Sequence, residues 1–151
     1  MKAAVVEGAG QLVLRDVPMP TVGPYDALVR IEACSICNAT DIKIIDRHFV
    51  SSIPVPLVLG HESVGAIVEV GAKVRNYRPG QRVLRPGARY SAAQSKLASA
   101  WGGFAQFGLV TDAAAWCKDH PELPAPGMAL KQQIVPAEIP PAEATALITL
   151  K

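Results

Sequence analysis

Two segments of the sequence carry side chains that can bind a metal ion. Cys37 ends the run Cys34-Ser35-Ile36-Cys37, and His61 and Glu62 are neighbours further along the chain. A thiolate, an imidazole and a carboxylate form a ligand set that suits Zn²⁺. Cys34 and Cys37 also allow a second interpretation, a Cys-x-x-Cys redox or zinc-knuckle pair. A structural four-cysteine zinc site is not expected, because the chain has three cysteines and no second pair of this kind.

His61 and Glu62 stand where an apolar segment, residues 57–60, passes into a predicted strand over residues 62–71. Such a corner between loop and sheet is a rigid mount for a functional side chain. Alternation along the strand predicts one face with Val64, Ala66, Val68 and Val70, and an opposite face with Ser63, Ile67 and Glu69. Three glycines around the corner predict close backbone approach or a positive φ: Gly60, Gly65 and Gly71.

The other predicted strands are short and separated by turns. They cover residues 2–7, 11–16, 26–33, 81–84 and 103–110, with a hairpin turn at residues 8–10 and an extended segment at 134–136. Residues 85–100 are polar and weakly patterned, so we interpret them as a surface excursion. Trp101 and Phe104, which follow, are interpreted as core residues, with a position at the border of a substrate pocket as the alternative.

Helical spacing predicts two helical segments. In residues 38–49 the spaced apolar residues are Ile42, Ile45 and Phe49, and Thr40 or Asp41 can act as the cap. Residues 140–151 begin with proline and an acid in the first turn, and the apolar face carries Ala144, Leu147 and Ile148. This second helix reaches Lys151 without a terminating residue, so we expect the chain to be cut within a helix.

Composition narrows the class of protein. The 151 residues suit one domain, and half are apolar, 19% are charged and the net charge is +2. This balance favours neither nucleic acid nor a membrane surface as a partner, and no apolar stretch reaches the ~20 residues of a membrane span. The odd number of cysteines argues against a secreted disulfide framework and favours a reducing cytoplasm.

Several motifs together resemble those of the zinc-dependent medium-chain alcohol dehydrogenases. They are Glu32-Ala33-Cys34-Ser35-Ile36-Cys37, Thr40-Asp41, Gly60-His61-Glu62-Ser63-Val64-Gly65, Gly71, Pro79-Gly80-Gln81-Arg82-Val83 and Gly102-Gly103-Phe104-Ala105. They occur in the family's order and cover nearly the whole chain. The Gly-His-Glu signature with an upstream cysteine is the most specific of them.

The resemblance implies a mainly β fold, a GroES-like, partly open β-barrel with a few short helices. Residues 1–151 would be the catalytic domain, ending in the helix that leads to an absent dinucleotide-binding domain. The sequence has no Gly-x-Gly-x-x-Gly fingerprint of its own. The resemblance further implies NAD or NADP in the full-length enzyme, a small alcohol or carbonyl substrate, and a homo-oligomer formed through the missing domain. We therefore expect no turnover by these residues alone.

The resemblance also assigns roles to individual residues. Cys37 and His61 match the catalytic zinc ligands, and Glu62 matches an adjacent acid that can replace one of them. Asp41 matches the acid that hydrogen-bonds the ligand histidine. Cys34 matches a frequent cysteine that is not a ligand. The position of the third protein ligand falls near Thr149, which is not a typical zinc ligand.

Two further residues match the family's proton relay. Thr40 matches the hydroxyl that takes the alcohol proton, although one more residue separates it from Cys37 than in the commonest form of the motif. Lys43 stands two residues after the acid, where many members have a relay histidine. Residues 85–101 contain no cysteine, so the family's optional structural zinc is not expected.

Alcohol oxidation by hydride transfer is favoured by an ion that acidifies the substrate hydroxyl, and zinc held by such ligands does this. Zinc can lower the pKa of a bound hydroxyl far below its ordinary value, to ~7 for bound water, which favours loss of hydride to a nicotinamide. Two other functions stay open from the sequence. One is a zinc-independent reductase of the same superfamily, and the other is a non-catalytic GroES-like binding module.

Overall fold

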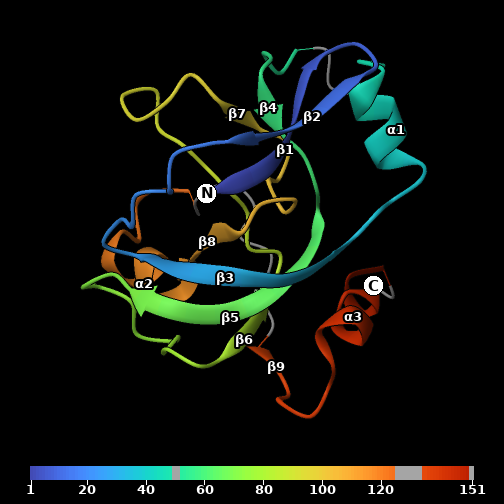
Figure 1. Ribbon diagram of the computed structural model, residues 1–151. Helices are drawn as coiled ribbons and strands as arrows, with labels where there is room; N and C mark the ends of the chain where they lie inside the picture. Colours follow the sequence, from blue (N-terminus) through green and yellow to red (C-terminus); the bar gives the residue numbers. More distant parts are fainter. Residues whose placement is uncertain (49–51, 125–133, 150–151) are drawn as a thin grey trace.

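A computed structural model of the chain describes residues 1–48, 52–124 and 134–149. Short strands dominate it, with brief helices between and after them (Figure 1). The elements are β1 (Lys2–Gly8), β2 (Gln11–Asp16), β3 (Asp26–Ser35), α1 (Thr40–Ile45), β4 (Leu57–Val58), β5 (Glu62–Val70), β6 (Arg82–Leu84), β7 (Ala98–Ser99), β8 (Phe107–Thr111), α2 (Ala113–Asp119), β9 (Ile134–Val135), α3 (Pro141–Ala144) and α4 (Ala146–Thr149). No helix among these residues is long and apolar enough to span a bilayer.

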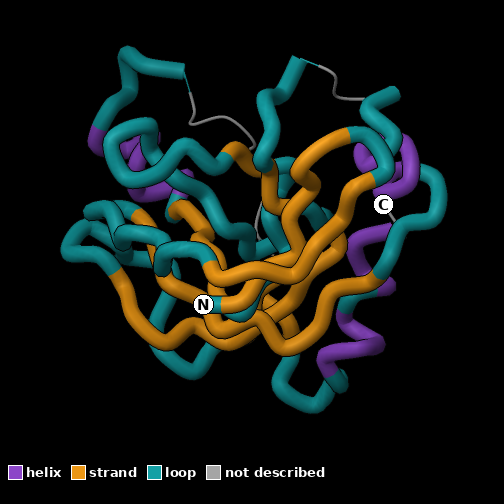
Figure 2. Tube along the Cα trace, turned by 45° about the horizontal axis from the view of Figure 1, so that its top comes forward, coloured by secondary structure: helices purple, strands orange, loops and turns teal. Residues whose placement is uncertain are grey.

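The described strands form two sheets that do not close into a complete barrel. One sheet has the order β2-β1-β4-β7 and the other has the order β8-β3-β5-β6-β9. Figure 2 shows the strands gathered in the middle of the molecule, with the helices at its periphery. The sequence prediction of a mainly β, partly open GroES-like barrel with few short helices is confirmed.

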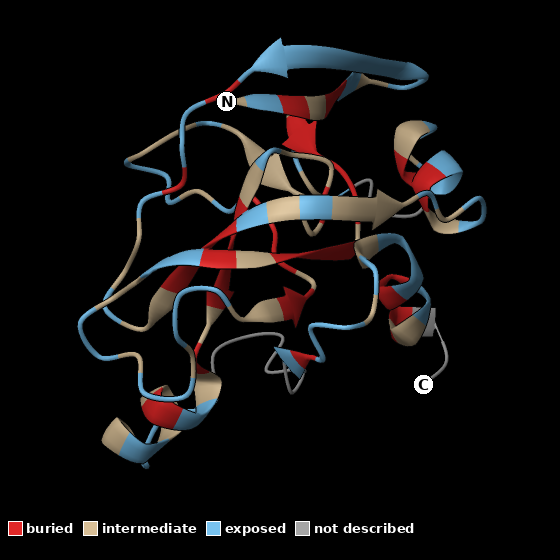
Figure 3. Ribbon diagram, turned by 60° about the horizontal axis from the view of Figure 1, so that its bottom comes forward, coloured by how far each residue is buried: buried red, intermediate tan, exposed pale blue. Residues whose placement is uncertain are grey.

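The core is built from small aliphatic side chains in several clusters, one of which places Val64 against the C-terminal helices α3 and α4. Val5 and Val6 of β1, Val29 of β3 and Val64 of β5 are fully buried. Figure 3 shows the buried stretches on these central strands, whereas β2 is exposed along its whole length at the edge of its sheet. Leu14 of β2 is 73% exposed. Most of the domain's hydrophobic stabilisation therefore comes from the central strands.

Most predicted elements are confirmed. The hairpin of residues 2–16 pairs Lys2 with Asp16 and turns at Gly10, whose φ is +70°. The predicted strands at residues 26–33, 81–84 and 134–136 correspond to β3, β6 and β9. The helix after Pro140 begins with proline at its first position and buries Ala144 and Ile148, although it consists of two short pieces, α3 and α4.

The apolar face predicted for the first helix is wrong. Ile42 is 48% exposed, whereas Ile44 is fully buried and Asp41 is 2% exposed. Residues three apart on a helix lie on one face, so burial of Asp41 and Ile44 turns Ile42 outward. Neither Thr40 nor Asp41 is the cap residue, because Ala39 occupies that position without a side-chain hydrogen bond. Phe49 lies outside the described residues.

The predicted alternation along β5 is also wrong in its second half. Val29 of β3 faces Ile67, and the next pair is Leu28 with Glu69, so Val68 is an extra, unpaired residue. This β-bulge reverses the faces beyond it. As a result Val70 packs against the same cluster as Ile67, and Val68 is 44% exposed.

Residues 85–100 are not simply a surface excursion. Residues 86–88 are buried, and Ala98–Ser99 pair with β4 as the parallel strand β7. Gly87 allows close packing in this segment, because a Cβ there would lie 1.7 Å from the carbonyl oxygen of Trp101. The predicted strand over 103–110 begins only at Phe107, since residues 103–106 bend across to Gly60 and Lys2.

Three glycines around the His61 corner were predicted to allow close approach or positive φ, and all three do. A Cβ on Gly65 would lie 2.3 Å from the carbonyl oxygen of Arg30, and one on Gly71 would lie 2.1 Å from that of Gly23. Gly60 has φ +105°, and its Cβ would lie 2.5 Å from the backbone nitrogen of Phe104. The residue before His61 is therefore restricted to glycine by both conformation and space.

A buried carboxylate, Asp112, fastens α2 to the loop after β5. Its Oδ2 accepts hydrogen bonds from the backbone of Arg75 and Asn76, both 2.8 Å long, and its Oδ1 accepts from the Asn76 side chain and from the backbone of Ala115. The last of these is an N-cap. Burial acts to raise the pKa of Asp112, but these hydrogen bonds outweigh it and hold the pKa below its ordinary value.

The Asp112→Asn variant should be less stable than the wild type by about 2–4 kcal/mol at neutral pH, because at least one donor loses its acceptor in a buried place. Since the folded pKa is lowered, the carboxylate stabilises the fold above the unfolded pKa and loses this effect as pH falls through the folded pKa. The gap between variant and wild type in urea unfolding should therefore shrink toward pH 3. Asp16→Asn, which alters an exposed pair with Lys2, should leave the midpoint unchanged.

Gly60→Ala should destabilise the domain far more than Gly80→Ala. Gly80 has φ +86°, and a Cβ added there would meet no atom within 4 Å, so alanine adds backbone strain alone, about 1–2 kcal/mol. At Gly60 the same strain is joined by a collision with the backbone of Phe104. Equilibrium unfolding of the two variants separates these effects, and equal losses would contradict the collision.

Candidate metal centre

Cys37 is positioned by the start of α1. It follows the end of β3, its carbonyl oxygen accepts a hydrogen bond from the backbone of Asp41 at 2.9 Å, and its own N–H donates to Asp41 Oδ2 at 2.9 Å. This closed pair of hydrogen bonds fixes the backbone that carries the thiol. The Cys37 side chain is half-buried.

His61 and Glu62 are positioned by the pairing of β5 with β3. Glu62 begins β5 and lies opposite Ser35, the last residue of β3. Cys37 comes two residues after Ser35. The antiparallel register therefore brings the two segments of candidate ligands to the same end of the sheet.

The structure brings Cys37, His61 and Glu62 together. One ligand atom from each of the three lies within 4.8 Å of the other two. The distance from His61 Nε2 to Glu62 Oε1 is 3.7 Å. Glu62 is 7% exposed and the His61 side chain 15%, so the group is largely shielded from solvent.

Asp41 lies on the other edge of the imidazole. Its Oδ1 is 3.3 Å from His61 Nδ1, although the two atoms are not aligned for a hydrogen bond. An N–H on Nδ1 facing this carboxylate leaves Nε2 as the free acceptor on the side of Glu62. Asp41 thus contacts both Cys37 and His61. The resemblance implied its contact with His61, but the sequence did not reveal its contact with Cys37.

Thr40 and Lys43 are placed differently. Both belong to α1, but Thr40 is half-buried and Lys43 is exposed. Among the described residues no side-chain hydrogen bond or ion pair joins either of them to Cys37, His61 or Glu62. The side chain of Thr149 lies outside the described residues.

Cys34 is separate from this group. Burial raises the pKa of its thiol to about 12, with hydrogen bonding to the Glu62 backbone acting in the opposite direction. Its thiol faces the carbonyl oxygen of Ser35 at 3.8 Å. A protonated, half-buried thiol is a poor nucleophile. These properties fit a packing role for Cys34 better than a Cys-x-x-Cys redox pair.

Trp101 lies beside His61, a contact that the sequence motifs did not predict. Its ring lies 5.2 Å from the imidazole of His61, centroid to centroid, with 48° between the planes. It also packs against the core cluster that contains Ile44 and Leu59. The position of Trp101 directly before Gly102-Gly103 was the available signal in the sequence for this contact. The spacing of the motifs, however, did not connect Trp101 with His61.

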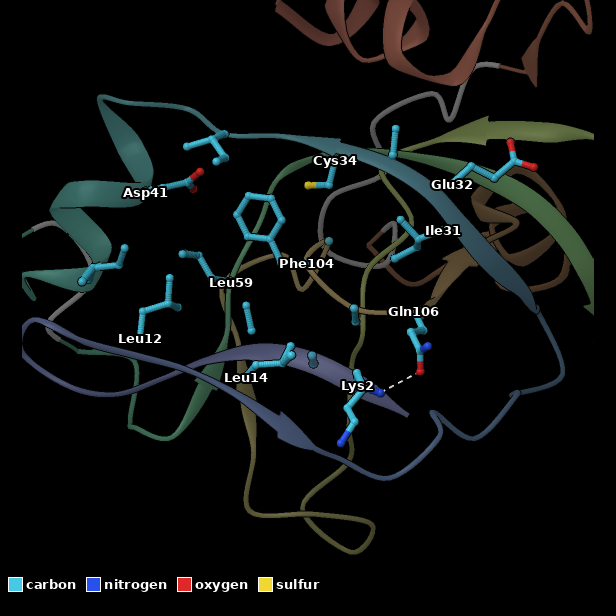
Figure 4. A pocket seen from close by; sticks show the side chains of 17 residues that line it. Lys2, Leu12, Leu14, Ile31, Glu32, Cys34, Asp41, Leu59, Phe104 and Gln106 are labelled. Atoms are coloured by element: carbon cyan, nitrogen blue, oxygen red, sulfur yellow. Dashed lines mark hydrogen bonds between the residues drawn. The ribbon is translucent and has the colours of Figure 1, made fainter.

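An apolar cavity of about 550 Å³ borders Asp41. Figure 4 shows Asp41, Cys34 and Phe104 around it, with Leu12 and Leu14 of the hairpin on the opposite side. Phe104 also touches the corner before His61, because its ring lies against Gly60. The volume is in the range of small-molecule sites.

Comparison with known proteins identifies the family of the chain. Residues 23–121 match the model of the alcohol dehydrogenase GroES-like domain. An alcohol dehydrogenase of Cupriavidus necator is 42% identical over 108 residues, which are 69% of this chain and 29% of that protein. An L-threonine 3-dehydrogenase of Chelativorans sp. is 44% identical over 89 residues, which are 58% of this chain and 25% of that protein. The chain thus spans less than a third of these relatives.

Solved structures show the same fold. An alcohol dehydrogenase superfamily protein from Novosphingobium aromaticivorans is 30% identical with a TM-score of 0.68, over 97% of this chain and 38% of that one. A protein of Sinorhizobium meliloti described as a zinc-binding dehydrogenase, bound to NADP, is 28% identical with a TM-score of 0.67, over 95% of this chain and 41% of that one. With the family match over most of its length, the chain belongs to the alcohol dehydrogenase GroES-like domain family.

Proposed function

We propose that this domain is the zinc-binding catalytic part of an NAD(P)-dependent alcohol dehydrogenase, which transfers hydride between a small alcohol or carbonyl compound and a nicotinamide. The observation that carries the proposal is the convergence of Cys37, His61 and Glu62 at one end of the β3–β5 pair. The relatives are oxidoreductases with the same domain, and one similar structure is described as zinc-binding.

The geometry of the three side chains suits a zinc ion. Ligand atoms around tetrahedral zinc, with bonds of about 2.0–2.3 Å, lie roughly 3.3–3.8 Å apart. The 3.7 Å between His61 and Glu62 is already in this range, and the full set within 4.8 Å needs only small side-chain rotations. Mg²⁺ and Ca²⁺ prefer ligand sets made of oxygen atoms alone. The mixed set of sulfur, nitrogen and oxygen donors therefore does not suit them.

Each residue has a distinct part in this proposal. Cys37 and His61 hold the metal, Glu62 is the third donor or its substitute, and zinc when bound supplies Lewis acidity to the substrate oxygen. Asp41 keeps the proton of the imidazole on Nδ1 and so leaves Nε2 for the metal. Thr40, at the first turn of α1, would take the alcohol proton, and the exposed Lys43 would pass it toward solvent.

We propose that the nicotinamide is bound by another part of a longer protein. The sequence contains no Gly-x-Gly-x-x-Gly fingerprint, and the relatives are more than three times as long as the matched segment. We therefore propose that NAD or NADP binds to a second domain and that residues 1–151 do not turn over alone. A homo-oligomer would form through that second domain.

The same residues argue against the two competing functions. A zinc-independent reductase could use the apolar cavity beside Asp41 to hold a substrate, and a non-catalytic module could use the barrel surface. Neither function requires a thiol, an imidazole and two carboxylates at one place. The metal content of the purified protein separates these functions from the proposed one.

The wild-type domain should retain about one zinc ion per chain after dialysis, since its site offers three donors. Cys37→Ser and His61→Ala should each lose the metal, whereas Cys34→Ser should keep it as the matched control. Elemental analysis by mass spectrometry, together with circular dichroism for folding, gives the answer. Loss of zinc in the Cys34 variant alone would contradict the assignment of Cys37.

Asp41→Asn should weaken zinc binding by about 10–100-fold, as is usual when the partner of a ligand histidine is altered. The amide cannot hold both the Cys37 backbone and the imidazole as the carboxylate does. Competition with a chromophoric chelator measures the affinity. Asp46→Asn, at the exposed end of the same helix, is the control and should bind as the wild type does.

A further inference from the structure

We propose that Trp101 is a positioning residue of the metal centre, and that its indole ring fixes the plane of the His61 imidazole. The inference rests on the proposed zinc function, because positioning matters only if His61 is a ligand. It concerns a side chain that contributes no donor atom to the site.

The imidazole of His61 is held on two edges and one face. Asp41 Oδ1 lies 3.3 Å from Nδ1 and Glu62 Oε1 lies 3.7 Å from Nε2, so a carboxylate faces each ring nitrogen without an aligned hydrogen bond. Neither prevents the ring from tilting about the line between them. The indole of Trp101, at 5.2 Å and 48°, contacts the ring itself and restricts this tilt.

The backbone of Trp101 is in an uncommon conformation. Its φ is +63°, in the left-handed region, which a bulky residue other than glycine seldom adopts. Such conformations persist where the surrounding structure enforces them, and they cluster at functional sites. Glycine would fit this backbone without strain, so the presence of a tryptophan here calls for a contribution from its ring.

Hydrogen bonds fasten the turn of Trp101 to the segment before His61. The N–H of Ala100 donates to the carbonyl of Val58 at 2.8 Å, and that of Gly103 donates to the carbonyl of Gly60 at 2.7 Å. Trp101 therefore lies between two residues, Ala100 and Gly103, whose backbones are hydrogen-bonded to the segment just before His61. Its contact with the imidazole is set by this backbone register.

The indole also connects His61 to the helix that carries Asp41. Trp101 packs against the cluster that includes Ile44 of α1 and Leu59. A shift of α1 would move Asp41 and the surface on which the indole rests in the same direction. The indole thus couples the position of the imidazole to the position of its carboxylate partner.

The chain offers a matched control, since it has two tryptophans and the other one also lies against a histidine. The rings of Trp116 and His120 are 4.9 Å apart with 42° between their planes. The acidic group nearest to His120 Nδ1 is Glu122, at 3.9 Å. This second pair has almost the same ring geometry, but it lies outside the Cys37, His61 and Glu62 group.

Binding of Co²⁺ tests the inference, because cobalt reports its coordination through visible absorption. Trp101→Leu should weaken Co²⁺ binding by about tenfold or more and alter the absorption bands. Trp101→Phe, which keeps an aromatic face and serves if the leucine variant does not fold, should stay within about threefold of the wild type. Trp116→Leu should change neither. Equal affinity and spectra for the wild type and Trp101→Leu would overturn the proposal.

A measurement without metal separates this inference from the proposed function. In the metal-free protein, the indole should shift the proton resonances of the His61 ring, assigned with a His61→Gln variant, and this shift should vanish in Trp101→Leu. If the wild type shows the shift but binds no Co²⁺, the zinc function fails while the ring contact holds. Absence of the shift in the wild type would refute the positioning by Trp101.

Discussion

The antiparallel pairing of β3 with β5 is the constraint on which the candidate site depends. Placing Ser35 opposite Glu62 brings a cysteine just beyond one strand close to a histidine just before the other. Gly65 permits this pairing at close range, since any side chain there would meet the backbone of Arg30. The bulge at Val68 lies further along, and after a second irregularity between Ile31 and Ala33 the register runs unbroken from Ala33 with Val64 to Ser35 with Glu62. A shift by one residue would turn these side chains to the other face of the sheet.

Asp41 shows how the fold tolerates a buried charge for the sake of that site. It is 2% exposed, and one of its oxygens is satisfied by the Cys37 backbone while the other faces His61 without an aligned hydrogen bond. An arrangement of this kind is costly in an apolar interior, and a cation bound at Nε2 of His61 would relieve it by making the Nδ1–H of the ring a stronger donor toward Asp41. Asp112 is the contrasting case, a buried carboxylate with all its partners within the protein.

Sequence reasoning reached the hairpin and the glycine positions from alternation and turn chemistry, whereas the fold class and the meeting of Cys37, His61 and Glu62 were implied by the resemblance to a known family. It failed where tertiary contacts override local pattern. Burial of Asp41 rotated the first helix away from the predicted Ile42 face, and a bulge exposed Val68. It also missed α2, although Asp112 before three alanines is a recognisable N-cap signal. The contact of Trp101 with His61 depends on loop packing, which no spacing rule encodes.

The exposed strand β2 has a consequence for the behaviour of the domain in solution. It lies at the edge of its sheet and leaves Leu12 45% and Leu14 73% exposed, so it is a template on which another chain could add a strand. Two ion pairs, Lys2 with Asp16 and Arg15 with Glu7, place charges along this rim. Charges of this kind oppose edge-to-edge aggregation, and because they are exposed, concentrated salt screens them. The colloidal stability of the isolated domain should therefore be greatest at low ionic strength.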